Sequence, residues 1–228
     1  MKRIFAATIG AVLIASPFFA SAQAKNFEGF FAEAGLGYGT FNGSFSGGNL
    51  STSGGTALGA YSVDANTIKS LIGVIGGGYN FALTNEFVLG VGGSYSPSRS
   101  ASASSTVTVP ASLGSTMNAA GAVGNIYSIY LSPGYAISQD SLIYGKVGYT
   151  GATAVFSGSV PNVNLNGYVL GLGFKKTIDK NLYGFVEGKY ASFGSKDLEP
   201  NALSSSITNT GSMSAKGMDI VVGVGYKF

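Results

Sequence analysis

The 228-residue chain contains no cysteine and no histidine. Without cysteine there can be no disulfide, no thiolate metal site and no lipid attached to an N-terminal cysteine. Without histidine, the side chain that most often transfers protons near neutral pH is missing, which excludes catalysis by an imidazole base. No acidic residues stand at the spacing of a calcium-binding loop. We therefore predict no cofactor, no metal site and no catalytic residue.

Charge and long apolar runs are also scarce. Charged residues make up 10% of the chain, against about 25% in ordinary soluble domains, and they form no basic stripe that would bind nucleic acid. Beyond the N-terminal segment, no apolar run approaches the ~20 residues of a membrane-spanning helix. Yet 45% of the residues are hydrophobic and 36 are glycine. This composition indicates a chain whose outer surface lies in lipid but which does not cross the membrane with helices.

The N-terminal segment has the order of a secretory signal peptide. A basic start, Met1-Lys2-Arg3, precedes an apolar run over residues 4–15 and small residues over 20–24. The apolar run is broken by Ser16-Pro17 and is too short to cross ~30 Å of hydrocarbon as a helix. We expect cleavage after Ala24, which makes residues 1–24 the signal peptide and residues 25–228 the mature domain.

The C-terminal segment is the clearest strand. From Met218 to Phe228 the even-numbered residues are all apolar, while the odd-numbered ones are mostly glycine or charged. Successive side chains of a strand point to opposite faces. An apolar face ending in the aromatic pair Tyr226 and Phe228 is expected of a strand with lipid on one side and a polar lumen on the other.

Seven further segments alternate in the same way, which gives eight predicted strands. Four of the seven connections are long and rich in Ser, Gly, Ala, Thr and Asn, which predicts mobile, solvated loops. The other three are short. In the second strand Leu71 and Ile75 are assigned outward, although Ile72 and Val74 would suit the opposite register. The strands cover about 30–41, 69–81, 87–95, 127–137, 143–150, 168–175, 182–190 and 218–228.

These features predict an all-β fold, an eight-stranded antiparallel up-and-down transmembrane β-barrel preceded by a cleaved signal peptide. The sheet must close because each unpaired backbone group would cost several kcal/mol in lipid. Tyrosines fall near both ends of the strands, as two aromatic girdles would require. A soluble, secreted sandwich is the alternative. It would bury its apolar face against a second sheet, whereas here the opposite face is mostly glycine and serine.

Several charged residues fall on inward faces of the predicted strands. Eight strands leave an interior just wide enough for side chains to fill, so charges inside it should pair. We predict a lumen salt-bridge network, with Lys175 and Lys227 as further candidates. An acid–base site built from the same groups is the alternative. The five residues of the predicted network are Glu33, Lys146, Glu187, Lys189 and Asp219.

Three motifs support a resemblance to a known family. The signal peptide together with Gly35-Leu36-Gly37-Tyr38, Gly77-Gly78-Tyr79 and Val224-Gly225-Tyr226-Lys227-Phe228 resembles the eight-stranded outer-membrane barrel superfamily. That group includes the opacity proteins and the membrane domain of outer-membrane protein A. The resemblance covers the whole mature chain. It implies the outer membrane of a Gram-negative bacterium, contact with outer-membrane lipid and lipopolysaccharide, and a barrel-assembly machinery that reads Tyr226 and Phe228.

Three functions remain open at this stage. The favoured one is a structural or surface-interaction role, in which the long external loops meet an extracellular ligand. The alternative is a narrow, porin-like channel for ions or small solutes, with the lumen charges controlling conduction. The third is an enzyme, and because histidine is absent we predict no enzymatic activity.

Overall fold

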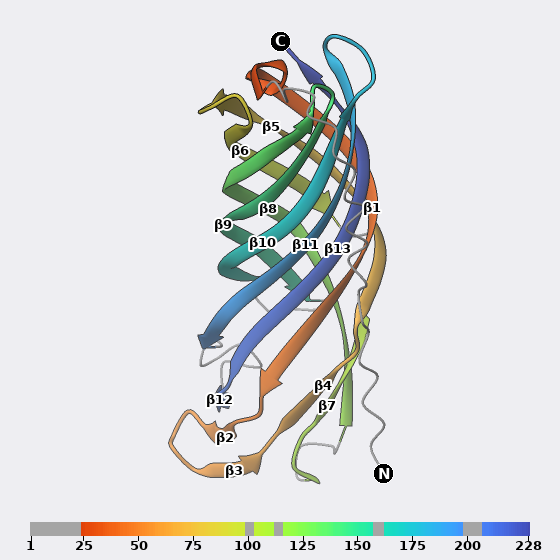
Figure 1. Cartoon of the computed structure of the whole chain (residues 1–228). Helices are drawn as coiled ribbons and strands as arrows, with labels where there is room; N and C mark the ends of the chain where they lie inside the picture. The colour runs from red at the N-terminus through yellow and green to blue at the C-terminus, as the bar shows by residue number, and fades with distance from the viewer. Residues whose placement is uncertain (1–23, 99–102, 112–115, 157–161, 198–206) are drawn as a thin grey trace, which may run out of the picture.

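The computed structural model describes residues 24–98, 103–111, 116–156, 162–197 and 207–228. Of the expected signal peptide, only Ala24 lies within the described residues. Eight long strands form a barrel (Figure 1), and each corresponds to one of the eight predicted strands, so the all-β prediction is confirmed. They are β1 (Gly29–Ser46), β5 (Ile68–Ala82), β6 (Phe87–Ser98), β8 (Thr116–Ser138), β9 (Ser141–Phe156), β10 (Val163–Thr177), β11 (Leu182–Asp197) and β13 (Ser212–Lys227).

The barrel closes because its first and last strands pair. β1 is antiparallel to β13 from the pair Phe31–Lys227 to the pair Ser46–Ser212, and it pairs with β5 on its other side. The remaining strands follow chain order, each antiparallel to the next. All eight strands therefore have two neighbours, which is the condition for crossing a bilayer with strands. Among the described residues, no helix has the length and apolarity needed to span a membrane.

The two ends of the barrel differ, as the sequence predicts. The connections β5–β6, β8–β9 and β10–β11 are short and lie at the end that also holds the C-terminus (Figure 1). We call this the short-turn end. The four longer connections lie at the opposite, long-loop end. In outer-membrane barrels the short turns face the periplasm and the long loops face the exterior.

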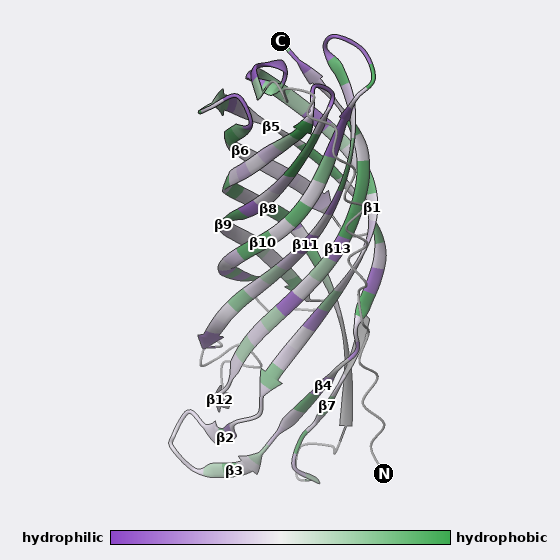
Figure 2. Cartoon of the chain, in the orientation of Figure 1, coloured by the Kyte–Doolittle hydropathy of each residue, from purple (hydrophilic) through white to green (hydrophobic). Residues whose placement is uncertain are grey.

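The outer face of the barrel is apolar. Green, hydrophobic positions alternate with paler ones along the strands in Figure 2. Leu172 is 73% exposed, and in β5 Leu71 is 69% exposed while Ile72 is 3% exposed. The register with Leu71 and Ile75 outward is therefore correct. Soluble proteins rarely expose a continuous apolar band of this kind, which argues against the secreted sandwich and for a lipid-covered wall.

Aromatic side chains border this band at both ends, so the two predicted girdles are confirmed. At the long-loop end the outward tyrosines are Tyr38, Tyr95, Tyr127, Tyr149 and Tyr168, all exposed. At the short-turn end the rings pair edge to face, with 4.8 Å between the centroids of Phe30 and Tyr79, 5.2 Å for Phe87 and Tyr135, and 5.1 Å for Tyr226 and Phe228.

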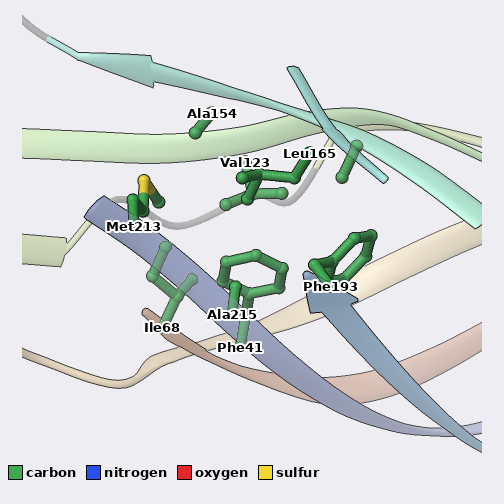
Figure 3. Close-up of a cluster of buried hydrophobic side chains, with 9 residues drawn as sticks. Phe41, Ile68, Val123, Ala154, Leu165, Phe193, Met213 and Ala215 are labelled. Carbon is green, nitrogen blue, oxygen red and sulfur yellow. The ribbon is translucent and has the colours of Figure 1, made fainter. Parts of the chain in front are cut away.

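Beyond the girdle at the long-loop end the strands continue with their polarity reversed. On β1, Asn42 and Ser44 are exposed while Phe41 is buried inside the barrel. Polar residues outside and apolar ones inside are the arrangement of a water-soluble protein, so the membrane boundary lies at this reversal. Figure 3 shows the buried group, here called the external cluster, which comprises Phe41, Ile68, Val123, Ala152, Ala154, Leu165, Phe193, Met213 and Ala215.

The long connections are more ordered than the sequence analysis predicts. They contain β2 (Asn49–Thr52), β3 (Ala57–Ala60), β4 (Ser62–Ala65), β7 (Ala103–Thr108) and β12 (Ile207–Asn209), which we call the external tier. β12, β2 and β3 form a second sheet, and β7 and β4 extend the barrel sheet from β8. Leu50, Tyr61 and Val109 form a small buried core there. These segments therefore form paired strands around a small core, which the sequence analysis did not predict, while most of their other residues are exposed, as predicted.

Candidate functional site

The middle of the lumen holds two buried ion pairs. Lys146 Nζ lies 2.6 Å from Glu187 Oε2, and Lys175 Nζ lies 2.6 Å from Glu33 Oε1. The side chains are 6% and 5% exposed in the first pair and 8% and 9% in the second. Neither pair joins adjacent strands: β10 separates β9 from β11, and two strands separate β1 from β10. The pairs therefore brace the barrel across its interior.

Tyrosine hydroxyls complete the hydrogen bonding of both carboxylates. Tyr144 Oη donates to Glu187 Oε2 at 2.8 Å, and Tyr183 Oη donates to Glu33 Oε1 at 2.8 Å. Lys146 Nζ lies 4.0 Å from the centroid of the Tyr130 ring, within range of a cation–π contact. Each buried carboxylate thus has a lysine and a tyrosine partner, which offsets the cost of burying it.

Inward glycines make room for these rings. Gly173 is the cross-strand partner of Tyr144, and a Cβ on Gly173 would lie 2.3 Å from Tyr144 Cζ. Gly225 stands in the same relation to Tyr183, again with 2.3 Å to Cζ. Glycine at these two inward positions therefore lets a tyrosine ring pack closely against the neighbouring backbone.

The other predicted lumen residues are placed less centrally. Lys189 and Asp219 are cross-strand partners on the inward faces of β11 and β13. Lys189 also lines a cavity of about 10 Å³ shared with Glu33 and Glu187, which is room for about one water molecule. Lys227 is not in this group, because its Nζ donates to the backbone oxygen of Asn26 at 2.7 Å near the short-turn end.

A short 3₁₀ turn, η1 (Ala24–Phe27), fills the short-turn mouth. Ala24 and Phe27 are buried in one cluster with Val88, Ala136 and Leu142. The buried amide of Asn80 donates from Nδ2 to the backbone oxygen of Phe27 at 3.1 Å. The Ala24 N–H donates to the oxygen of Asn85 at 2.8 Å. Because cleavage is expected after Ala24, the contacts that hold this segment in the mature domain are the burial of Phe27 and the hydrogen bond from Asn80.

The described part of the lumen is thus filled at three successive levels. η1 occupies the short-turn mouth, the ion pairs and their tyrosines occupy the middle, and the external cluster occupies the long-loop end (Figure 3). A cavity beside η1 and another beside the ion pairs each have a volume of about 10 Å³. Neither could pass a hydrated ion without movement of side chains.

The sequence analysis predicted neither η1 at the short-turn mouth nor the external cluster at the long-loop end. The external cluster has a readable signal, because Phe41 and Phe45 fall on the face opposite to the apolar face formed by Phe30, Leu36 and Tyr38. That change of face marks the point where water replaces lipid outside the wall. η1 has no such signal, because four residues are too few to show a period.

One ion pair lies outside the membrane, at the β8–β9 turn. Lys176 Nζ is 2.6 Å from Asp140 Oδ2, and the two side chains are 55% and 47% exposed. The hydroxyls of Ser138 and Ser141 donate to Asp140 Oδ1 at 2.6 and 2.8 Å. The hydrogen bond from Lys176, followed by those from the two serines, holds the pKa of Asp140 well below its usual range.

No metal centre is formed in the part of the chain that the structure describes, where no three acidic side chains gather to hold an ion. The arrangement is therefore one of paired charges and packed rings rather than of a reactive group facing an open pocket.

The fold and these features define the class. A closed barrel with an apolar outer band, two aromatic girdles, short turns at one end and long loops at the other is a β-barrel of the Gram-negative outer membrane. The chain belongs to the outer membrane protein beta-barrel domain family, whose model matches residues 10–228.

Several solved structures of outer-membrane proteins are similar to this chain. OprG of Pseudomonas aeruginosa is 14% identical, with 88% of this chain and 96% of OprG covered and a TM-score of 0.53, which shows a common fold. Ail of Yersinia pestis, solved with the heparin analogue sucrose octasulfate, is 17% identical, with 88% and 99% covered and a TM-score of 0.43. Neisserial surface protein A is 13% identical, with 87% and 97% covered and a TM-score of 0.42. No curated protein sequence matches the chain.

Proposed function

We propose that this protein is a non-conducting outer-membrane barrel that presents its external tier to a ligand outside the cell. The observation that carries the proposal is the filling of the described lumen at three levels. A porin-like channel needs a continuous aqueous path, and the two small cavities at the short-turn and middle levels hold about one water each. The filled interior therefore favours a structural and surface role over transport.

The external tier supports this role because barrel closure does not require it. The eight barrel strands already close without β2, β3 and β12, yet these strands form a sheet of their own. Leu50 in β2 is 1% exposed, so the segment is packed. Within the described residues β3 and β12 are the outer strands of this sheet, and an unpaired strand edge can accept an extended segment of a partner protein.

The lumen network takes a structural role in this proposal. Glu33, Lys146, Glu187, Lys189 and Asp219 serve to fix the cross-section of the barrel, so that the tier stands on a rigid support. The proposal gives these groups no acid–base role, because both central carboxylates are committed to lysine and tyrosine partners.

Tyr226 and Phe228 take the role that the family resemblance implies, that of the signal read by the barrel-assembly machinery. Their rings are 48% and 73% exposed on the outer face and pack edge to face. This exposure supports the assignment, because a second protein could contact both rings.

The test removes part of the tier and keeps the barrel. Replacing residues 49–60 by a short Gly-Ser linker deletes β2 and β3. A deletion in the β6–β8 connection, such as residues 100–105, would be a less suitable test. Residues 103–105 belong to β7, which pairs with β4 and β8, so this deletion would also disturb the barrel sheet. Cells displaying equal amounts of wild-type or deleted protein are compared for binding to immobilised matrix proteins and polysaccharides. We expect the deleted barrel to fold and to lose binding; undiminished binding would contradict the proposal.

A further inference from the structure

The external tier ends in an open strand edge. β12, β2 and β3 pair in that order, and among the described residues β3 pairs with β2 alone. β3 is the strand of this sheet that lies farthest from the barrel (Figure 1). Its free edge therefore faces away from the membrane, on the side from which another cell approaches.

Hydrogen bonds of β2 show which backbone groups of β3 face the open side. The N–H of Thr210 donates to the oxygen of Asn49 at 3.1 Å, and the N–H of Asn49 donates to Thr210 Oγ1 at 3.2 Å. The N–H and C=O of Asn49 therefore point away from β3. Asn49 is the cross-strand partner of Ala60, so this pair is not hydrogen-bonded and the N–H and C=O of Ala60 point to the open side.

β3 contains a bulge next to this residue. Leu50 pairs with Gly59, but Ser51 pairs with Ala57, so β3 has one more residue than β2 over this stretch. Gly59 has a φ of +122°, which side chains rarely allow, and a Cβ on it would lie 2.9 Å from Pro110 Cγ. Contact with the rest of the tier therefore holds the bulge in a fixed shape.

The bulge sets the spacing of the open backbone groups. Along β2 the groups of Ser51 point the same way as those of Asn49, toward β12, so its partner Ala57 also has its N–H and C=O on the open side. Ala57 and Ala60 are both exposed. The open groups of a regular strand recur at every second residue, which does not match positions 57 and 60. A bulged edge disfavours regular strands, but an antiparallel second copy of β3 has the same spacing.

The sheet carries no charge that would keep two copies apart. None of β2, β3 and β12 contains a lysine, arginine, aspartate or glutamate. Natural sheet edges are commonly protected by charged residues or proline. β4 follows β3 in the same connection and is the outer strand in the order of the barrel sheet, and it carries Asp64. Protection by charge is therefore present at β4 and missing at β3.

We propose that β3 pairs with β3 of a second copy of this chain on a neighbouring cell. The two strands run antiparallel about a two-fold axis, so that Ala57 of each copy lies opposite Ala60 of the other. Because the open edge faces away from the membrane, the two barrels stand in facing outer membranes. This inference rests on the proposed surface role of the external tier and identifies the ligand as the chain itself.

A single contact of this kind is weak. β3 is four residues long, and each backbone hydrogen bond gives only a small net gain in water. Many copies on two facing cells bind together, which raises the overall affinity by about 10²–10⁴-fold over that of one contact. The assay must therefore present many copies at once.

The test exchanges charges across the paired strands. Cells display equal amounts of the wild type, A57E/A60E or A57K/A60K, each with its own fluorescent label, and a gel shift between unheated and boiled samples checks that each barrel folds. Wild-type cells should aggregate. Either variant alone places like charges opposite each other, which should weaken one contact about ten-fold and abolish aggregation. A mixture of the two variants brings opposite charges together and should form aggregates that contain both labels.

Two further variants separate strand pairing from general charge. Ser44 and Ser46 are exposed on β1, and S44K/S46K should aggregate as the wild type does. Ala60→Pro removes an N–H on the open side that β2 does not use, so it should reduce aggregation without added charge; it decides if a charged variant fails to fold.

Three results would each overturn the proposal: wild-type cells that do not aggregate, aggregation of either charged variant alone, or a mixture without two-label aggregates. The deletion of residues 49–60 keeps this inference distinct from the proposed function. If that deletion abolishes matrix binding but the exchanged charges have no effect on aggregation, the surface role stands and pairing through β3 is refuted.

Discussion

Replacing Glu187 by alanine should be among the most destabilising single changes in the barrel. The Lys146 side chain is only 6% exposed, and the substitution removes the Glu187 Oε2 atom that lies 2.6 Å from its Nζ. It also removes the acceptor of the Tyr144 hydroxyl. Breaking a buried ion pair by removing one partner costs about 3–5 kcal/mol, because the remaining charge is uncompensated. We expect a loss of unfolding free energy of that size.

The exposed pair of Lys176 and Asp140 is the matched control. Its atoms are also 2.6 Å apart, but its side chains are 55% and 47% exposed. Exposed pairs contribute at most about 1 kcal/mol, so Lys176→Gln should cost far less than Glu187→Ala. The double variant Lys146→Met/Glu187→Leu removes both charges and should lie within about 2 kcal/mol of the wild type.

The assay is urea unfolding of the barrel in lipid vesicles, with the folded fraction read from gel mobility. Tyrosine fluorescence gives a second readout, since the chain has no tryptophan. If Glu187→Ala costs no more than Lys176→Gln, burial does not govern the strength of these pairs and the reasoning is refuted.

Three further outcomes are expected. The pKa of Asp140 is held below its unfolded value of about 3.9, so its pairing with Lys176 stabilises the fold at neutral pH and this stabilisation is lost as the pH falls below about 4. The difference in urea midpoint between the wild type and Lys176→Gln should therefore shrink as the pH falls below about 4. A difference that stays constant would count against this role of the pair. Phe27→Ala should lower stability by about 3 kcal/mol, and an unchanged urea midpoint would show that η1 does not pack in the mouth. Removing Phe228 should reduce assembly in cells but leave refolding from urea intact; normal surface levels would rule out its part in the signal.

The strand faces could be predicted from the sequence because period-two alternation is a local property. Leu71 and Ile75 face outward although Ile72 and Val74 suited the opposite face. The choice between the two registers of β5 is made by its pairing with β1, which places Leu71 beside Tyr38 and Ile75 beside Ala34. Strand register of this kind depends on the neighbouring strand and is not contained in the segment itself.

The partners within the lumen could not be predicted in the same way. The inward positions of Glu33 and Glu187 follow from alternation, but their partners lie on strands that are not adjacent to them. Which side chains meet across the interior depends on strand tilt and stagger around the whole barrel. Lys175, which the sequence analysis named only as a further candidate, forms the ion pair with Glu33. Lys189 and Asp219 are cross-strand partners on neighbouring strands.

The external tier was missed because composition alone suggested solvated loops. Serine and glycine dominate those segments, yet a few apolar residues, among them Leu50, Tyr61 and Val109, suffice to form a core. Such residues are spread over two connections in the chain, β1–β5 and β6–β8. Only their proximity in the folded protein turns them into a packed group.

Single-channel recording tests the central claim that the interior is closed. Mature protein, refolded in detergent and verified by the gel shift, is inserted into a planar bilayer under an applied potential. The filled lumen predicts a folded barrel with no discrete conductance steps, which would leave the external tier as the place of function. Reproducible steps of one size would contradict the account and make the ion pairs of Lys146 and Lys175 the walls of a conducting path.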